Sequence, residues 1–158
     1  MTTSELTWDF RFLRLAAEIS SWSKDPNTKV GAVVVDDDRQ ILSYGYNGFP
    51  RAIADNYRLN DRDQKLKFIV HAESNCIYNA ADKGVSLRGG TMYVHGLLVC
   101  SECAKALVQI GIKRVVMGYP QVIRAEWRES YKVSSAMFDE AGIDTRFYDS
   151  SQYIGENQ

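Results

Sequence analysis

Four residues in two short segments have the types and spacing of a metal-dependent catalytic site. His71 and Glu73 lie two positions apart in one segment, and Cys100 and Cys103 form a Cys-x-x-Cys pair in the other. One imidazole and two thiols are good zinc ligands, but a structural zinc site is closed by four protein ligands. Three ligands leave one position for water or substrate, so the set predicts a catalytic zinc centre.

The charges of these groups give Glu73 a separate role. Two thiolates cancel the double positive charge of zinc, so the ion is a weaker acid than one held by neutral histidines. A nearby carboxylate can take the proton from the zinc-bound water and pass it onward. We therefore predict that Glu73 is the general acid/base and not a fourth ligand.

Both segments must begin helices if they are to meet at one ion. Residues two apart on a helix do not share a face, so His71 and Glu73 can both approach a metal only where a helix starts. Cys100 and Cys103 are three apart and share a face at the start of their own helix. Two helix N-termini would then direct their positive ends at the site, which favours the thiolates that bind zinc.

Other interpretations of these residues stay open from the pattern alone. A Cys-x-x-Cys pair can be a redox site, although that motif usually follows the first strand of a thioredoxin-like unit. The centre could also be a non-catalytic zinc module, which needs a fourth ligand and makes Glu73 expendable. Cys76 is most simply a core residue, Glu102 an ordinary acidic residue of a first helical turn, and His95 a polar residue at a strand end.

Hydrophobic periodicity places these segments in an alternating series of helices and strands. We expect helices over residues 7–22, 71–81, 101–110 and 126–141, and a loop or flap over 48–63. We expect strands over residues 29–35, 40–46, 90–94, 113–117 and 144–148. The first two strands form a hairpin, and the later strands pair in parallel because helices separate them. The expected fold is α/β, a three-layer α/β/α sandwich with a mixed five-stranded sheet.

Length, charge and cysteine content limit the class of protein. The 158 residues have the size of one domain, which we take to be residues 1–158. A net charge of −1 argues against a nucleic-acid partner. Three cysteines do not resemble a secreted disulfide framework, residues 1–9 do not resemble a signal peptide, and no segment is apolar enough to span a membrane. We expect a cytoplasmic protein with no membrane partner.

Motifs spread from about residue 8 to residue 147 carry a family resemblance. They are SKDPN (23–27), VGA (30–32), GYNG (45–48), HAESN (71–75), TMYV (91–94), ECAK (102–105) and GIK (111–113). Together they resemble the deoxycytidylate (dCMP) deaminases of the zinc-dependent cytidine deaminase superfamily, so a cytidine-deaminase-like fold is expected. Val99 departs from the pattern, because the family usually has proline before the first cysteine.

The resemblance implies a reaction and roles for the four residues. The reaction is the hydrolytic deamination of dCMP to dUMP and ammonia by a zinc-activated water, which makes the chain a hydrolase acting on the C–N bond of a cyclic amidine. His71, Cys100 and Cys103 would hold the zinc, and Glu73 would be the proton shuttle. Deamination of cytidine, guanine or a tRNA adenosine is the alternative within the same chemistry.

The resemblance also implies substrate contacts. They are the Ala72 backbone N–H to the pyrimidine carbonyl, Asn47 to the sugar, and Val30 and Ala32 beside the base. Candidates for holding the 5′-phosphate are Lys24, Asn27 and Arg51.

Cofactors, assembly and regulation follow from the same resemblance. We expect one Zn²⁺ per chain, because residues 47–70 lack the extra Cys and His residues that hold a second zinc in some phage members. The substrate would be a small-molecule deoxynucleotide, and its deamination would feed dTMP synthesis. A homo-oligomer is expected, with a hexamer among the assemblies considered, under allosteric regulation by dCTP and dTTP with Mg²⁺.

Overall fold

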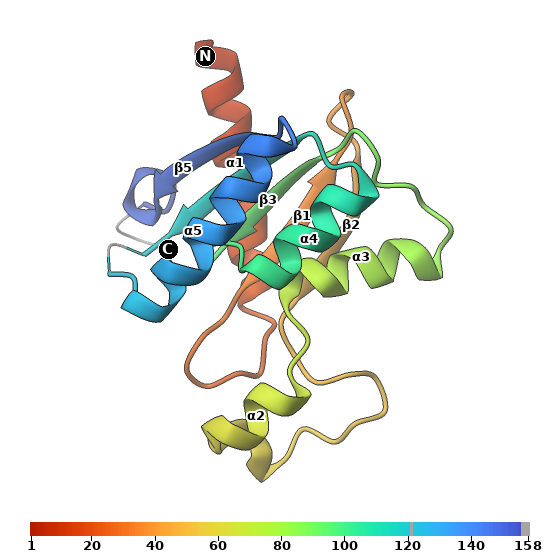
Figure 1. The fold of residues 1–158 in the computed structure, drawn as a ribbon, viewed down its shortest axis with the longest axis vertical. Coiled ribbons are helices and arrows are strands. Elements are labelled where there is room, and N and C mark those ends of the chain that lie inside the picture. The colour runs from red at the N-terminus through yellow and green to blue at the C-terminus, as the bar shows by residue number, and fades with distance from the viewer. Residues whose placement is uncertain (121, 156–158) are drawn as a thin grey trace.

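The computed structural model describes residues 1–120 and 122–155, which form a mixed five-stranded sheet with helices on both faces (Figure 1). The strands are β1 (Gly31–Val35), β2 (Ile41–Tyr46), β3 (Thr91–His95), β4 (Arg114–Tyr119) and β5 (Asp144–Asp149). The helices are α1 (Thr3–Ser20), α2 (Arg62–Phe68), α3 (Ala72–Asp82), α4 (Ser101–Ile110) and α5 (Ala125–Glu140), with short 3-10 turns η1 (Tyr57–Asn60) and η2 (Ser150–Gln152).

The strand order is β2-β1-β3-β4-β5. Strand β1 is antiparallel to both of its neighbours, whereas β3, β4 and β5 are parallel. The hairpin and the later parallel pairs therefore confirm the predicted mixed sheet. In the part of the chain that the structure describes, no helix is long and apolar enough to cross a membrane.

Strand β1 lies in the middle layer of the three-layer sandwich. All five of its residues are buried, as expected for a β-branched run covered on both faces. Ala32 and Val34 belong to the core shared with α3, α4 and α5, whereas Val33 and Val35 belong to the core shared with α1. The predicted sandwich is confirmed, and the helices that carry the candidate metal ligands lie on one face of it.

Helix α1 begins earlier than periodicity predicts. The expected range was 7–22, and the helix runs over Thr3–Ser20. Thr2 and Glu5 form a capping box, in which the Thr2 hydroxyl accepts from the Glu5 N–H and the Glu5 carboxylate accepts from the Thr2 N–H. This cap fixes the start of the helix ahead of its first apolar residues, so the apolar pattern alone does not reveal it.

The largest departure from the predicted fold is in residues 49–69, which we call the arm. The sequence predicted a loop over 48–63, and the structure contains η1 and α2, capped by the side chains of Asn56 and Asp61. Figure 1 shows α2 at the end of a long excursion away from the sheet. Leu59 and Lys65 are the arm's buried residues, so it has no apolar face from which periodicity could have predicted a helix.

Helix α3 is held closely against the edge strand β2. A Cβ on Gly45 would lie 2.4 Å from the Cys76 nitrogen and 2.6 Å from the Ala72 oxygen, so only glycine allows this approach. The Ser43 hydroxyl donates to the Cys76 carbonyl at 2.7 Å. These contacts fix the first turn of α3, where His71 and Glu73 lie.

Candidate metal centre and pocket

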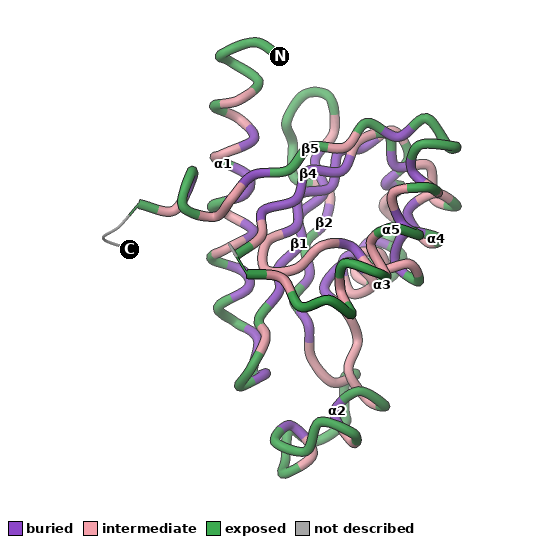
Figure 2. Tube along the Cα trace, turned by 60° about the vertical axis from the view of Figure 1, so that its left-hand side comes forward, coloured by how far each residue is buried: buried purple, intermediate pink, exposed green. Residues whose placement is uncertain are grey.

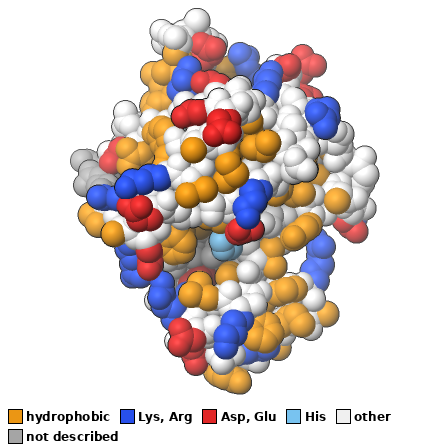
Figure 3. Space-filling model, in the orientation of Figure 1, with side chains coloured by type: hydrophobic (Ala, Val, Ile, Leu, Met, Phe, Trp, Pro, Cys, Tyr) orange, Lys and Arg blue, Asp and Glu red, His pale blue; other side chains and the backbone are white. Residues whose placement is uncertain are grey.

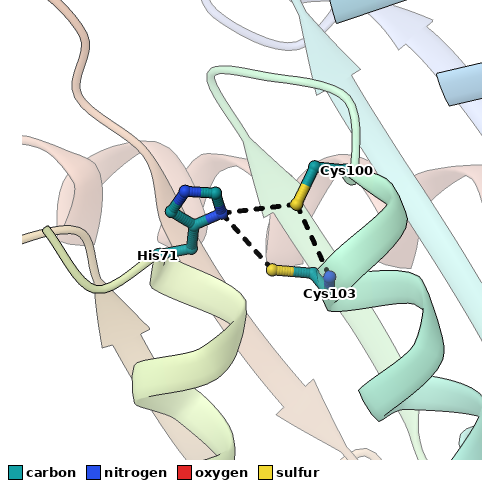
Figure 4. A group of neighbouring side chains, drawn as sticks. All are labelled: His71, Cys100 and Cys103. Carbon is teal, nitrogen blue, oxygen red and sulfur yellow. Dashed lines mark hydrogen bonds between the residues drawn. The ribbon is translucent and has the colours of Figure 1, made fainter. Parts of the chain in front are cut away.

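The structure brings His71, Cys100 and Cys103 together at one point (Figure 4). The His71 Nδ1 lies 3.4 Å from the Cys100 Sγ and 3.5 Å from the Cys103 Sγ. Across residues 1–120 and 122–155, this is the one group of three or more potential metal ligands whose ligand atoms all lie within 4.8 Å of one another. Three residues from two distant segments therefore form a compact donor set, as the sequence predicted.

Two helix N-termini position these ligands. His71 is the N-cap residue of α3, and Cys100 is the N-cap residue of α4. The Cys103 backbone N–H donates to the Cys100 Sγ at 3.5 Å, across the first turn of α4. The prediction that both motifs begin helices is confirmed, so the positive ends of two helix dipoles point at the donor set.

Helix α5 fixes the loop that carries Cys100. The Ser134 hydroxyl donates to the Val99 carbonyl at 2.8 Å, and the Ser101 N–H donates to the Ser130 hydroxyl at 3.1 Å. Val99 is fully buried. This chain therefore fixes the loop on both sides of Cys100 by packing and two serine hydrogen bonds, where the family usually has a proline.

The hydrogen bonds among the three ligands favour a thiolate at Cys100 and keep the protons on Cys103 and His71. The hydrogen bond from the Cys103 side chain lowers the pKa of Cys100, whereas the same bond raises the pKa of Cys103. The hydrogen bond to Cys100 raises the pKa of His71. The negative charge therefore settles first on Cys100, and a thiolate is the form of cysteine that binds metals.

The donor set fits zinc in chemistry and in spacing. In a tetrahedral site with bonds of about 2.0 Å to nitrogen and about 2.3 Å to sulfur, the nitrogen and sulfur atoms lie about 3.5 Å apart. The observed separations of 3.4 and 3.5 Å agree with that spacing. One imidazole and two thiols also suit zinc better than hard cations, which prefer oxygen ligands.

Glu73 is buried beside this group without belonging to it. Glu73 is 4% exposed and lines the same pocket as His71 and Cys100. Its carboxylate does not belong to the group of ligand atoms that lie within 4.8 Å of one another. Burial raises the pKa of Glu73 above that of an ordinary glutamate, chiefly through desolvation. A buried carboxyl next to a three-ligand metal centre can carry a proton and leaves the fourth metal position free.

A pocket of about 280 Å³ opens from this centre, close to the lower end of the usual size range for small-ligand sites. Figure 3 shows a hollow between the body of the protein and the arm, with a histidine side chain in it. Four of the substrate contacts predicted from the sequence line the pocket: Asn27, Val30, Asn47 and Ala72.

The sequence of the chain matches the profile of the cytidine and deoxycytidylate deaminase zinc-binding region over residues 6–119. The chain belongs to this family. It is therefore a zinc-dependent hydrolytic deaminase, and the His71–Cys100–Cys103 group is the donor set that the zinc-binding family and the observed geometry support.

Individual relatives agree with the family assignment. A probable deoxycytidylate deaminase of Drosophila melanogaster is 35% identical over 150 residues, covering 88% of this chain and 71% of the relative. The human deoxycytidylate deaminase is 34% identical over 149 residues, covering 89% and 79%. The crystal structure of dCMP deaminase from the cyanophage S-TIM5 has the same fold, with a TM-score of 0.71 at 22% identity, and the match covers 94% of this chain and 100% of that one.

Three residues that the sequence suggested for substrate binding lie outside the pocket wall of this deaminase. Lys24 is on the surface, where its ammonium pairs with Asp55 at 2.7 Å. Arg51 is exposed and donates to the Asn79 side chain at 2.6 Å. Ala32 is fully buried inside β1, two residues beyond Val30, which lines the pocket. Lys24 and Arg51 lie near family motifs in the sequence, but in the structure Lys24 pairs with Asp55 of the arm and Arg51 bonds to Asn79 of α3.

Asn47 lines the pocket but its side chain is already bonded to the backbone beside it. Its Oδ1 accepts from the Val30 N–H at 2.8 Å, and its Nδ2 donates to the Thr28 carbonyl at 2.9 Å. Asn47 therefore shapes the wall formed by residues 27–30, whatever contact it also makes with a sugar.

Sequence reasoning missed the basic and aromatic residues of the pocket. Arg62 and Lys65 come from α2, and Arg124 and Trp127 come from the start of α5. Trp127 adds an aromatic side chain to the pocket wall. No motif marks these residues, because they reach the deaminase pocket only through the placement of the arm and of α5.

Proposed function

We propose that this deaminase converts dCMP to dUMP and ammonia. One observation carries the proposal: a single pocket combines two sets of groups. The three-ligand centre and a buried carboxyl lie at its floor, and basic side chains line its wall. The D. melanogaster and human relatives are named as deoxycytidylate deaminases, and the cyanophage enzyme has also been solved with dCMP and dUMP. Both the pocket and the relatives favour a cytosine nucleotide over a free base.

The floor of the pocket supplies the hydrolytic chemistry. A zinc ion held by His71, Cys100 and Cys103 would make its water acidic enough to serve as the nucleophile. Glu73 would carry the two protons of that water, one to the ring nitrogen N3 and one to the amino nitrogen that leaves C4 as ammonia, while a C4–O bond replaces the C4–N bond. Its burial suits this role, because a raised pKa lies nearer to neutral pH than that of an exposed glutamate.

The wall of the pocket orients the base and the sugar. We assign the pyrimidine carbonyl to the backbone N–H of Ala72, which is an N1 residue of α3 and has no partner within its own helix. Val30 forms an apolar surface for the base, and Asn27 and Asn47 lie on the same wall as candidates for the sugar.

The mouth of the pocket supplies the charge for the 5′-phosphate. Arg62 and Arg124 line both this pocket and a second, more open hollow that contains none of the three metal ligands, so they lie where the pocket opens. Arg62 pairs with Glu126 at 3.0 Å, and both side chains are more than half exposed (56% and 51%). Such an exposed pair is weak, so a phosphate can replace Glu126 as the partner of the guanidinium. We therefore assign the phosphate to these two arginines in place of Lys24.

Further properties implied by the family resemblance belong to the same proposal. They are one zinc ion per chain, assembly as a homo-oligomer, regulation by dCTP and dTTP with Mg²⁺, and a cytoplasmic role in supplying dUMP for dTMP synthesis. The net charge of −1 supports a small-molecule substrate over tRNA or DNA.

One substrate comparison tests the proposal. Ammonia release is measured for dCMP, CMP, deoxycytidine, dCTP and guanine, with and without added dCTP and dTTP. We expect dCMP to have the highest kcat/KM and deoxycytidine to lose most of it through KM, because it lacks the phosphate. Equal kcat/KM for deoxycytidine and dCMP would contradict the assigned phosphate site, and preference for guanine would contradict the substrate.

A further inference from the structure

The arm has little of its own to hold it against the pocket. It leaves the body at Gly48 and returns at Val70, where two backbone hydrogen bonds join these residues at 3.1 and 2.8 Å. Figure 2 shows most of the arm exposed. Phe49 and Phe68 pack on each other within the arm, with ring centroids 5.9 Å apart, and no residue of the arm belongs to the two hydrophobic cores of the described residues. Its position over the pocket must therefore depend on a few polar contacts with the body.

One of these contacts is buried and the others are not. The Lys65 Nζ lies 2.9 Å from the Asp25 Oδ1, and the two side chains are only 8% and 4% exposed. The ion pairs Lys24–Asp55 and Arg62–Glu126, which also join arm and body, are on the surface. Exposed pairs contribute little, whereas removing one partner of a buried pair leaves an uncompensated charge. The Lys65–Asp25 pair is therefore the contact whose loss should disturb the arm most.

The same carboxylate oxygen also shapes the pocket wall. The Asp25 Oδ1 accepts from the Asn27 N–H at 2.9 Å and from the Thr28 N–H at 3.2 Å. Thr28 is in turn bonded to Asn47 through its carbonyl. A single oxygen therefore links the arm to the stretch of residues 27–30 that lines the pocket.

A buried ion pair is a costly way to gain stability, since well-packed apolar residues of similar volume often serve as well or better. The pair joins two segments that both line the pocket, so it can set the distance between them. We propose that Asp25 and Lys65 are positioning residues, which set the arm and residues 27–30 at the separation that the substrate needs. The proposal rests on the proposed function, because it assigns the pair to binding of the nucleotide.

Kinetics on matched variants test the pair. Lys65→Met and Lys67→Met each remove one lysine from α2, and only Lys65 is buried. We expect Lys65→Met to raise KM for dCMP and for deoxycytidine by about 10- to 100-fold with a smaller change in kcat, and Lys67→Met to leave both constants unchanged. Asp25→Asn retains the acceptor for the Asn27 and Thr28 N–H groups but removes the charge opposite Lys65, so it should raise KM in the same way. The double variant should be no worse than the worse single variant, and Lys65→Arg should recover part of the loss.

Limited trypsin digestion gives a readout that needs no substrate. Lys65→Met and Lys67→Met remove one cleavage site each, so they can be compared directly by mass spectrometry of cuts within residues 49–69. We expect faster cleavage of the arm in Lys65→Met than in Lys67→Met, and faster cleavage in Asp25→Asn than in the parent, with zinc content unchanged in all of them.

Three outcomes would overturn the proposal. The first is an equal effect of Lys65→Met and Lys67→Met on KM. The second is unchanged trypsin cleavage of the arm in Lys65→Met and Asp25→Asn. The third is a KM increase in Lys65→Met that is confined to dCMP, with KM of Asp25→Asn unchanged. The last outcome would make Lys65 a direct phosphate ligand. A parent protein that deaminates no cytosine compound would contradict the proposed function, whereas the digestion would still show whether the pair holds the arm.

Discussion

The floor and the mouth of the pocket are built in opposite ways. At the floor, Glu73 and Cys103 are buried on helices that pack into the core shared with the sheet, and α3 approaches β2 so closely that Gly45 cannot carry a side chain. At the mouth, Arg62 and Arg124 are exposed and come from an arm and a helix end. The groups assigned to the chemistry are therefore held against the core, and those assigned to the phosphate are held by a few polar contacts.

This difference predicts how the two regions respond to substitution. A change at the floor should affect the metal or the chemical step for every substrate, because the same atoms act on any cytosine ring. A change at the mouth should alter KM for dCMP and not for deoxycytidine, because it acts only on the 5′-phosphate that distinguishes the two substrates.

The largest effect is expected from loss of a metal ligand. Cys103→Ala should lose zinc and all measurable deaminase activity, and it should lower the melting temperature because metal binding stabilises the folded state. Cys76→Ala is the matched control, since it removes a buried thiol that lies on α3 and is not a ligand. Zinc is measured by elemental analysis, and undiminished metal in Cys103→Ala would refute the assigned donor set.

An intermediate effect is expected at the mouth. Arg124→Ala should raise KM for dCMP by about 10- to 100-fold, since it removes a charged hydrogen bond to phosphate worth roughly 1.5–3 kcal/mol. KM for deoxycytidine should not change. Arg128→Ala, on an exposed position of the same helix, is the control. Equal changes for both substrates would remove Arg124 from phosphate recognition and weaken the distinction between floor and mouth.

The smallest effect is expected at Lys24. Its ammonium pairs with Asp55 on the surface and does not line the pocket, so Lys24→Ala should leave the ratio of KM values for dCMP and deoxycytidine unchanged. A selective rise in KM for dCMP would show that the phosphate lies nearer to residues 23–27 than the pocket wall indicates.

The sequence predicted the floor and not the mouth, for a physical reason. His71, Glu73, Cys100 and Cys103 lie in two short motifs whose spacing has geometric meaning only at helix starts, and α3 and α4 do begin there. The sheet was predictable as well, because β1 is a run of apolar and mostly β-branched residues between turn signals.

The arm and the mouth depend on contacts between distant residues that carry no local pattern. Helix α2 has no apolar face, and its buried side chain is a lysine whose partner, Asp25, lies 40 positions earlier. Lys24 lies near a recognised motif but does not line the pocket, while Arg124, which no motif marks, lines it at the start of α5. Only the tertiary structure determines whether such residues line the pocket.

The central claim is that Glu73 moves protons beside a three-ligand metal centre, and Glu73→Gln tests it most directly. Zinc content and the rate of deamination are measured on the same preparation, with Glu102→Gln as an exposed acidic control. We expect Glu73→Gln to keep the parent's zinc content and to lose about 10²- to 10⁴-fold in rate, while the control keeps both. A variant that deaminates as fast as the parent would show that Glu73 is not the proton carrier, and one that loses its zinc together with its activity would show that Glu73 is needed to hold the metal.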